Sequence, residues 1–382
     1  MTFDGLIAAI RAANGCPEGF LPLHAPVFAG KEREYVLDAI DSTFVSSVGG
    51  YVDRFEDMLR EATGAGQAVA CVNGTAALQV ALILAGVRPG DLVVTQALSF
   101  AATANAIRHA GGEPVFLDVE ADTLGLSPDS LRDFLQKECE TAGGACRHKA
   151  SGRRVAASVP VHIFGFPGRI DSICSIGAEW GLPVVEDAAE ALGSAYQGKH
   201  CGSFGRLGIL SFNGNKIVTT GGGGAILTPD RELGQRAKHL TTTAKRPHRW
   251  EFRHDELAWN YRLPNINAAL GCAQLERLGA FVAWKRNLAA RYEALFAPTP
   301  WRFLKEPPGS SSNYWLCSVL FRDRNERDAF LAASNEAGVM TRPAWEPLHT
   351  LPAFTECLRG DLAATLYLAD RLVNLPSGVR HG

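Results

Sequence analysis

One lysine of the sequence stands where a buried strand should end, close to a run of glycines. Residues 211–216 read Ser-Phe-Asn-Gly-Asn-Lys, and four consecutive glycines follow at 221–224. Because the apolar run 207–212 predicts a strand, Lys216 should be partly removed from water, and burial lowers the pKa of a lysine and makes its amine a better nucleophile. The glycines would let the backbone pack closely around a bulky group. The alternative is a surface lysine beside a flexible turn.

An acidic pair follows the apolar residues 183–185. Glu186 and Asp187 stand at the carboxyl end of this predicted strand, where an acid can cap the next helix, move protons, bind a metal or pair with a buried cation. A metal site would need further oxygen ligands close by, and only Glu190 is near in the sequence. The capping role and the chemical roles both remain open at this point.

Two further strand ends could bind a ligand. Asn73, Gly74 and Thr75 lie between a predicted strand and a predicted helix, and a helix N-terminus offers free N–H groups and a positive dipole end to a phosphate. The alternative is a simple helix cap at Thr75. Ser99 and Phe100 also follow a strand, where the aromatic ring could stack on a planar ligand or belong to the core.

These groups together indicate one cofactor. Open parallel sheets bind ligands at the carboxyl ends of their strands, and this sheet edge would carry a nucleophilic lysine, an acid, a phosphate cradle and a stacking aromatic. Pyridoxal phosphate needs that set of groups: the acid keeps the pyridine nitrogen protonated, so that the ring withdraws electrons from a carbanion, and the lysine binds the cofactor covalently. We therefore predict pyridoxal 5′-phosphate as the cofactor and no metal.

Short apolar strands alternate with helices between residues 51 and 227. This alternation predicts a mostly parallel sheet covered by helices on both faces. Residues 141–154 are polar, glycine-rich and basic; we expect a surface insertion there and not a nucleic-acid patch, since no aromatic residues are interleaved. The expected strands are 68–72, 92–95, 114–119, 157–163, 183–186, 207–212 and 225–227, and the expected helices are 75–85, 101–110, 127–140 and 170–180.

The pattern changes after about residue 245. Two helices, at 265–278 and 282–296, are followed by a strand at 314–321 and a helix at 326–337, which predicts a smaller α+β domain. We expect residues 1–20 to be an N-terminal extension, residues 21–245 the large cofactor-binding domain, and residues 246–382 the small C-terminal domain.

Composition narrows the class of protein. The chain has 382 residues, of which 46% are hydrophobic and 20% charged, with a net charge of −2; this balance gives no electrostatic attraction to nucleic acid or to an anionic membrane. No stretch approaches the roughly 20 apolar residues of a membrane-spanning helix. Nine scattered cysteines without a C-x-x-C pair indicate a reducing, cytoplasmic compartment.

The sequence resembles the pyridoxal-phosphate-dependent nucleotide-sugar aminotransferases of the DegT/DnrJ/EryC1/StrS type, from residue 21 to residue 377. The resemblance implies the fold-type I aminotransferase architecture, an α/β large domain with a mostly parallel mixed sheet plus a smaller C-terminal α+β domain. Three segments, DSTFVSSVG (41–49), PVHIF (160–164) and TRPAW (341–345), are most similar to the branch that acts in the legionaminic acid pathway. The general motifs are NGTAAL (73–78), SFAATANAI (99–107), VEDAA (185–189), SFNGNK (211–216) and WNYRLPNINAALGCAQL (259–275).

The resemblance also implies a role for each matching residue. Lys216 would be the catalytic acid and base and the covalent attachment point. Asn260 matches an asparagine that reaches the phosphate from the neighbouring subunit, which implies a homodimer with shared active sites. The remaining roles are phosphate binding by Gly74, Thr75 and Ser211, ring stacking by Phe100, pairing of Asp187 with the pyridine nitrogen, a place for Glu190 near the ring hydroxyl where relatives often have glutamine, and a substrate contact for Arg262.

The implied reaction moves an amino group from L-glutamate to C4 of a nucleotide-linked 4-keto-6-deoxy sugar, UDP-2-acetamido-4-keto-2,6-dideoxyhexose, in surface-glycan or nonulosonic-acid biosynthesis. The alternatives are a perosamine-synthase-like enzyme acting on GDP-4-keto-6-deoxymannose, an enzyme acting on a 3-keto sugar, a pyridoxal-phosphate lyase, and a regulator that binds the cofactor without catalysis. A sister group with histidine in place of the lysine dehydrates sugars, and Lys216 argues against that reaction. The sequence does not identify the nucleotide, the sugar epimer or the pathway.

Overall fold

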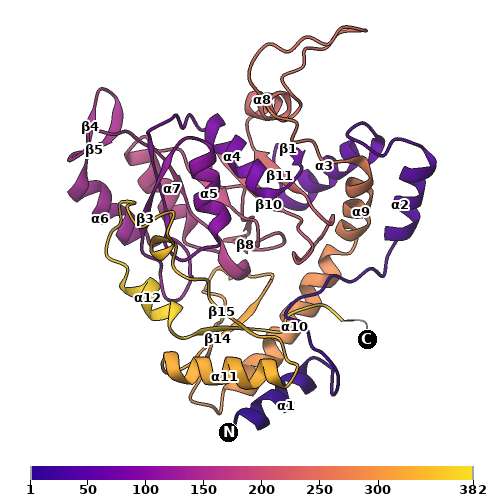
Figure 1. Ribbon diagram of the computed structural model, residues 1–382, viewed down its shortest axis with the longest axis vertical. Helices are drawn as coiled ribbons and strands as arrows, with labels where there is room; N and C mark the ends of the chain where they lie inside the picture. The colour runs from indigo at the N-terminus through magenta and orange to yellow at the C-terminus, as the bar shows by residue number, and fades with distance from the viewer. Residues whose placement is uncertain (1, 381–382) are drawn as a thin grey trace.

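The computed structural model describes residues 2–380 and places a mixed β-sheet with flanking helices beside a smaller sheet that has its own helices (Figure 1). The large sheet has the strand order β3-β2-β6 on one side and β7-β10-β11-β1 on the other. Two isolated parallel bridges, Ser158 to Val184 and Val161 to Asp187, join the two halves. The strands are β1 (Gln67–Cys71), β2 (Leu92–Gln96), β3 (Glu113–Leu117), β6 (Val155–Val159), β7 (Val185–Asp187), β10 (Leu207–Ser211) and β11 (Gly224–Thr228).

Only β11 runs against the other strands of this sheet. It pairs antiparallel with both β1 and β10, whereas β10 is parallel to β7 and β2 is parallel to β3 and β6. The mostly parallel mixed sheet predicted from the sequence is thereby confirmed. Its direction brings the carboxyl ends of β1, β2, β7 and β10 to one edge of the sheet, which is where a ligand would bind.

Helices cover both faces of the sheet because successive strand residues point to opposite sides. In β1, Val69 and Cys71 pack with α4 and α8, whereas Ala68 and Ala70 pack with α3 and α9. Helix α5 lies beside α4, and helices α6 and α7 cover the β2 and β3 end from the other face. These helices are α3 (Gly50–Thr63), α4 (Gly74–Leu84), α5 (Ala101–His109), α6 (Pro128–Glu138), α7 (Ile170–Glu179), α8 (Arg231–Thr241) and α9 (Asn265–Leu275).

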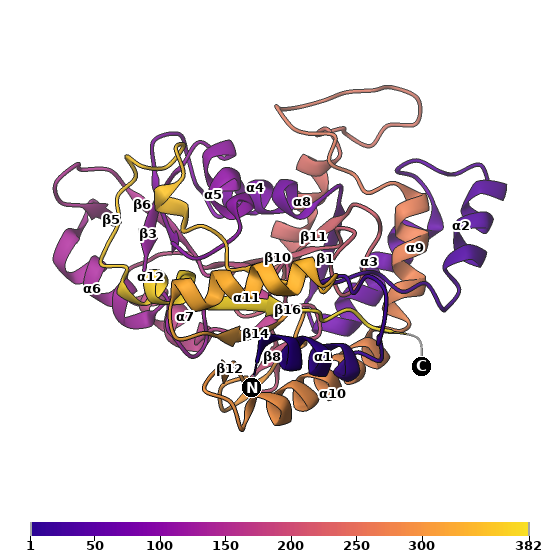
Figure 2. The same cartoon turned by 60° about the horizontal axis from the view of Figure 1, so that its bottom comes forward.

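The smaller sheet has the order β12-β14-β16-β15 and packs against α1, α10 and α11. Helix α1 lies beside α10 and α11 in both views (Figures 1 and 2). Leu6 and Ile10 are fully buried there, and Phe3 packs edge-on against Phe330 at 5.5 Å. The first helix of the chain thus shares one hydrophobic core with helices from its last third. The elements are α1 (Phe3–Ala13), α10 (Leu278–Phe296), β12 (Arg302–Phe303), β14 (Cys317–Leu320), α11 (Arg324–Glu336), β15 (Arg342–Pro343), α12 (Ala363–Ala369) and β16 (Leu372–Leu375).

Some elements differ from the sequence-based expectation. The basic segment 141–154 lies at the surface, but much of it forms a hairpin with its preceding residues, in which Cys139 and Cys146 are buried against the sheet and α6. The glycine run 221–224 packs against the chain itself: a Cβ on Gly224 would overlap the backbone of Asn73. The remaining elements are α2 (Glu32–Asp41), β4 (Cys139–Ala142), β5 (Ala145–His148), β8 (Ala195–Tyr196), β9 (Lys199–His200), β13 (Ser310–Ser311) and the 3-10 turns Ile163–Gly165 and Leu348–Thr350.

Among residues 2–380, none of the helices combines the length and the apolar character that crossing a lipid bilayer requires.

Candidate active site

A cavity of about 360 Å³ opens at the carboxyl edge of the large sheet and collects residues from loops far apart in the sequence. Trp315 and Trp345, from the part of the chain that carries the smaller sheet, complete its wall. Of the residues predicted from the sequence, seven line this cavity: Gly74, Thr75, Phe100, Asp187, Glu190, Ser211 and Lys216.

Lys216 is held in the cavity by two neighbours. Strand β10 ends at Ser211, and a turn brings the Lys216 N–H to the carbonyl of Asn213. Only 13% of the lysine side chain is exposed. Its Nζ lies 3.0 Å from Glu190 Oε1 and 4.0 Å from the ring centroid of Trp315. The surface-lysine alternative is therefore wrong, and the amine is placed between a carboxylate and an aromatic face.

Glu190 is a buried carboxylate shared between two donors. Its Oε1 pairs with Lys216, and its Oε2 accepts the backbone N–H of Phe164 at 2.8 Å. Burial raises the pKa of Glu190, whereas the Lys216 ammonium and the Phe164 N–H act in the opposite direction. Its place beside the lysine gives it a chemical contact that the sequence analysis did not predict, because the expected role was next to the cofactor ring.

Asp187 is the last residue of β7 and is also buried. Its Oδ2 accepts the Thr103 hydroxyl at 2.8 Å, and its Oδ1 accepts the Ala189 N–H at 3.2 Å. Burial raises the pKa of Asp187, with these hydrogen bonds opposing that rise. A turn, and no helix, follows the strand, so the helix-capping alternative for Asp187 is wrong. A buried carboxylate with two donors has capacity left for a cationic ligand.

The N-terminus of α4 fits a phosphate. The helix begins at Gly74, and its cap is Asn73, whose Oδ1 accepts the Ala76 N–H at 2.8 Å; the alternative that Thr75 is the cap is therefore wrong. Within residues 2–380 the N–H groups of Gly74 and Thr75 have no hydrogen-bond partner. A Cβ on Gly74 would lie 3.0 Å from Ser211 Cβ, so glycine keeps this cradle open.

Aromatic rings form one wall of the cavity. Phe100 is 56% exposed and lies 6.1 Å from Trp345, so the core-phenylalanine alternative is wrong. Trp345 in turn stacks on the buried Phe164 at 4.7 Å. Thr103 and Trp345 each lie in a family motif quoted above, but neither was assigned a role in the site. Trp315 lies outside these motifs and reaches the cavity through the fold, so no local signal marks it.

Among the described residues, the side chains of Asn260 and Arg262 do not line the cavity, although the backbone of Arg262 pairs with Cys71 at the end of β1. Asn260 is exposed, and its Oδ1 accepts the Arg262 Nε–H at 3.0 Å. Neither side chain is among the cavity-lining residues. The predicted contact of Asn260 with the phosphate of the neighbouring subunit stays a prediction.

The residues present fit pyridoxal phosphate. The open helix N-terminus beside Ser211 suits its phosphate, the buried Asp187 suits a protonated pyridine nitrogen, and Lys216 lies in the same cavity with its amine partly removed from water. Two observations support this assignment. The N–H groups at the start of α4 are free, and a Cβ on Gly74 would narrow the space beside them.

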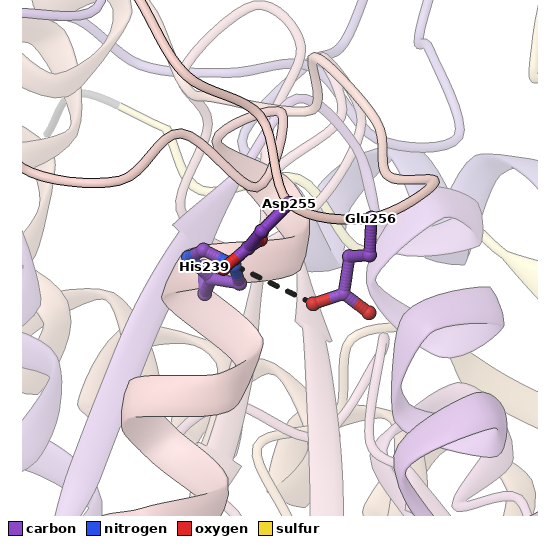
Figure 3. Close-up of side chains that lie close together, drawn as sticks. All are labelled: His239, Asp255 and Glu256. Atoms are coloured by element: carbon purple, nitrogen blue, oxygen red, sulfur yellow. Dashed lines mark hydrogen bonds and ion pairs between the residues drawn. The ribbon is translucent and has the colours of Figure 1, made fainter.

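Away from the cavity, three side chains in the described part of the chain lie close enough together to hold a metal ion (Figure 3). His239 on α8 lies 2.7 Å from Asp255 Oδ1 and 3.4 Å from Glu256 Oε1. Arg236 pairs with Glu256, and Arg246 lies 3.2 Å from Asp255. Both acids already have arginine partners, so we interpret this group as a surface ion-pair network.

Comparisons with known proteins agree with this geometry. Residues 27–381 match the DegT/DnrJ/EryC1/StrS aminotransferase family. The chain is 37% identical over 363 residues to EpsN of Bacillus subtilis (strain 168), which is named as a pyridoxal phosphate-dependent aminotransferase, with 93% of this chain and 90% of that protein covered. It is 34% identical to a GDP-perosamine synthase of Escherichia coli O157:H7, with 94% and 93% covered. The crystal structure of the aminotransferase TlmJ from Streptoalloteichus hindustanus superposes with a TM-score of 0.85 at 30% identity, with 94% of each chain covered.

Proposed function

The chain belongs to the DegT/DnrJ/EryC1/StrS aminotransferase family, whose members depend on pyridoxal phosphate, and we propose that it aminates a nucleotide-linked keto sugar. The proposed reaction transfers the amino group of L-glutamate to C4 of a 4-keto-6-deoxy sugar, with UDP-2-acetamido-4-keto-2,6-dideoxyhexose as the acceptor in surface-glycan or nonulosonic-acid biosynthesis. The observation that carries the proposal is the cavity in which Lys216, Asp187 and the N-terminus of α4 meet.

Lys216 is the proposed catalytic acid and base. When bound, pyridoxal phosphate supplies an electron sink for the negative charge that develops as a proton leaves carbon. Lys216 Nζ takes the proton from the α-carbon of glutamate in the first half of the reaction. In the second half the same amine takes part in delivering a proton to C4 of the sugar. Its place between Glu190 and Trp315 keeps it on one side of the cavity for both transfers.

Asp187 and Glu190 have different proposed tasks. Asp187, oriented by the Thr103 hydroxyl, pairs with the cofactor's ring nitrogen and keeps it protonated. Glu190 pairs with Lys216 in the cofactor-free protein, and its carboxylate would face the ring hydroxyl of the bound cofactor. The two carboxylates are both buried, so each gains stability in its charged form only when a cation or a donor faces it.

The remaining residues bind and orient. The N–H groups of Gly74 and Thr75 and the Ser211 hydroxyl would hold the phosphate, and Phe100 would stack on the ring. The aromatic side chains of Trp315 and Trp345 present apolar faces to the cavity, which suits the C–H-rich face of a 6-deoxy sugar. Arg262 remains a candidate for contact with the substrate.

A homodimer with shared active sites is part of the proposal. After α8, Thr242 and Asn260 bridge each other, and the loop between them rises away from the body of the protein (Figure 1). This segment exposes Trp250, Phe252 and Leu257, which are 71%, 77% and 87% accessible, and it ends at Asn260. Exposed apolar side chains of this size mark interaction surfaces. A second copy of this chain would cover them and bring Asn260 to the phosphate of the neighbouring site.

One specific observation favours a second candidate acceptor. Relatives at 33% to 34% identity are named GDP-perosamine synthase, so GDP-4-keto-6-deoxymannose is the alternative substrate. A 3-keto sugar has no comparable support from the relatives described above.

The test offers a panel of keto sugars to the purified enzyme with pyridoxal phosphate and L-glutamate. The panel contains the UDP-linked 4-keto acetamido sugar, GDP-4-keto-6-deoxymannose, a dTDP-linked 4-keto-6-deoxy sugar and a 3-keto sugar. We expect mass spectrometry to detect an amine in place of the ketone with the UDP-linked sugar, at the highest kcat/KM. If the enzyme prefers the GDP-linked sugar, GDP-4-keto-6-deoxymannose is the acceptor in place of the UDP-linked sugar. Amination of none of the four sugars would contradict the proposal.

A further inference from the structure

Asn313 is a fully buried residue between the two domains. Its Nδ2 donates to the carbonyl oxygens of Glu190, at 2.9 Å, and Leu192, at 2.8 Å. Its Oδ1 accepts the backbone N–H of Trp315 at 2.7 Å. Because two acceptors and one donor surround the amide, its orientation is determined by its partners. One side chain thus ties the backbone of Glu190 in the large domain to the backbone of Trp315 in the small domain.

Both residues that Asn313 connects contact the ammonium group of Lys216. Glu190 Oε1 lies 3.0 Å from Nζ, and the Trp315 ring centroid lies 4.0 Å from it, within cation–π range. Trp315 Nε1 also donates to the carbonyl of Asn215, the residue before the lysine, at 2.7 Å. The position of Nζ therefore depends on how Glu190 and Trp315 are placed relative to each other.

The turn Ile163–Gly165 supports the same arrangement from the other side of Glu190. Phe164 has φ 57° and ψ 12°, a left-handed conformation that is strained for a bulky side chain. This conformation directs its N–H to Glu190 Oε2. At Gly165 a Cβ would overlap Asn313 Oδ1. The turn thus fixes the carboxylate of Glu190 and leaves room for Asn313 only because residue 165 is glycine.

We propose that Asn313 is a positioning residue for Lys216, which it orients by fixing Glu190 and Trp315 relative to each other. The inference rests on the proposed role of Lys216 as the catalytic acid and base. Asn313 does not line the cavity, so it acts through its two partners. A lysine side chain has several rotatable bonds, whereas reacting groups have to be placed within about 0.5 Å of the productive position. Contacts on two sides of the ammonium group supply that restriction.

Two substitutions at residue 313 test whether both connections are needed. Asn313→Ala removes both. Asn313→Asp keeps an acceptor for the Trp315 N–H but puts an oxygen against the carbonyls of Glu190 and Leu192. The matched control is Asn374→Asp, the same change at another buried asparagine, which accepts the Ser318 hydroxyl at 2.7 Å in the small sheet and lies outside the cavity lining.

Three measurements on the full-length protein read out the effect. The first is the rate at which cofactor-free protein captures pyridoxal phosphate on Lys216, followed by absorbance and by the mass of the borohydride-reduced peptide. The second is kcat and KM for amino transfer. The third is the thermal midpoint, so that all rates are compared well below unfolding.

Both Asn313 variants should capture the cofactor and turn over about 10- to 100-fold more slowly, with KM nearly unchanged, because the loss lies in positioning and not in substrate binding. Asn374→Asp should retain wild-type rates. In a Glu190→Gln background the further cost of Asn313→Ala should shrink, since residues that act through one another are not additive.

Wild-type rates in both Asn313 variants, or equal losses in Asn374→Asp, would show that Asn313 supports only the fold and would overturn the inference. A full, undiminished cost of Asn313→Ala in the Glu190→Gln background would overturn it as well. Failure of the proposed function looks different: the wild-type protein itself would then show no amino transfer, or would capture the cofactor away from Lys216.

Discussion

Asp187 is a buried carboxylate for which the described chain supplies two hydrogen-bond donors but no cation in direct contact. Its carboxylate is withdrawn from water and accepts only the Thr103 hydroxyl and the Ala189 N–H within residues 2–380. Burial raises its pKa, so between the ordinary aspartate pKa and this raised value the cofactor-free protein holds a proton that the unfolded chain has released. Stability then falls as the pH rises through the raised pKa. A cationic ring nitrogen would remove this cost by pairing with the charge.

We predict that Asp187→Asn separates stability from catalysis. Without cofactor, the asparagine variant should gain stability relative to the wild type as the pH rises from the ordinary aspartate pKa to the raised pKa of Asp187, with a slope of at most about 1.4 kcal/mol per pH unit, since an amide does not ionise. With cofactor and substrates, kcat should fall by at least about 100-fold, because a preorganised charge is lost. Thermal unfolding across pH and steady-state kinetics check both parts. Near-normal turnover would show that Asp187 does not pair with the ring nitrogen.

Sequence reasoning located the site residues that lie at strand ends and missed those that arrive through tertiary packing. Lys216, Asp187 and Gly74 each follow an apolar strand, so the residue type and the position together predicted their place in the cavity. Asn313 bonds to the carbonyl of Glu190, a residue 123 positions earlier. No periodicity or local motif relates two such positions, because the contact exists only once the two domains are packed together.

At the scale of elements, hydrophobic pattern predicted the strands well and some helices less well. The strands of the large sheet are short apolar runs buried on both faces. A continuous apolar run of this kind is typical of a strand in a parallel sheet covered by helices. Helix α3 was not predicted, although Val52, Phe55 and Leu59 are buried at the spacing of an amphipathic helix. The hairpin of β4 and β5 was expected only as a surface insertion, because its polar, glycine-rich composition does not show clearly the alternation that buries Cys146 and His148.

Helix α4 illustrates how one element both builds the core and presents a site. Its residues Ala77, Leu78 and Val80 are buried in the core between the sheet and α5, while its first two N–H groups face the cavity. Asn73 caps the helix through Ala76. The cap therefore satisfies a donor one residue further along and leaves the leading groups for a ligand.

At the scale of the whole molecule, one chain leaves apolar side chains exposed that a second copy would cover. The segment 242–260 presents apolar side chains and ends at Asn260, which does not reach the cavity of its own chain. A symmetric pair of chains would exchange these segments, so that each active site uses residues of both copies. The sequence could suggest this only through the family resemblance, since no pattern within one chain encodes the position of a second copy.

We predict that active sites are restored when two inactive variants share a dimer. Lys216→Ala and Asn260→Ala chains, each poorly active, are mixed under conditions that exchange subunits. If Asn260 acts across the interface, a mixed dimer carries both defects in one site and leaves the other intact, so activity should return to about a quarter of the wild-type level with random exchange. Unmixed samples treated in the same way are the control. If mixed dimers form but stay inactive, Asn260 acts in the active site of its own chain and the prediction is wrong.

The central claim, that Lys216 moves an amino group from glutamate to a keto sugar through this cavity, is tested most directly by a two-stage labelling experiment. Holoenzyme is incubated with heavy-nitrogen L-glutamate, freed of small molecules, and then given the keto sugar alone. The account predicts one heavy amino group on the sugar per active site from the wild type, and none from Lys216→Ala treated in parallel. A light amino group on the sugar, no amination at all, or full transfer by the Lys216→Ala protein would contradict it.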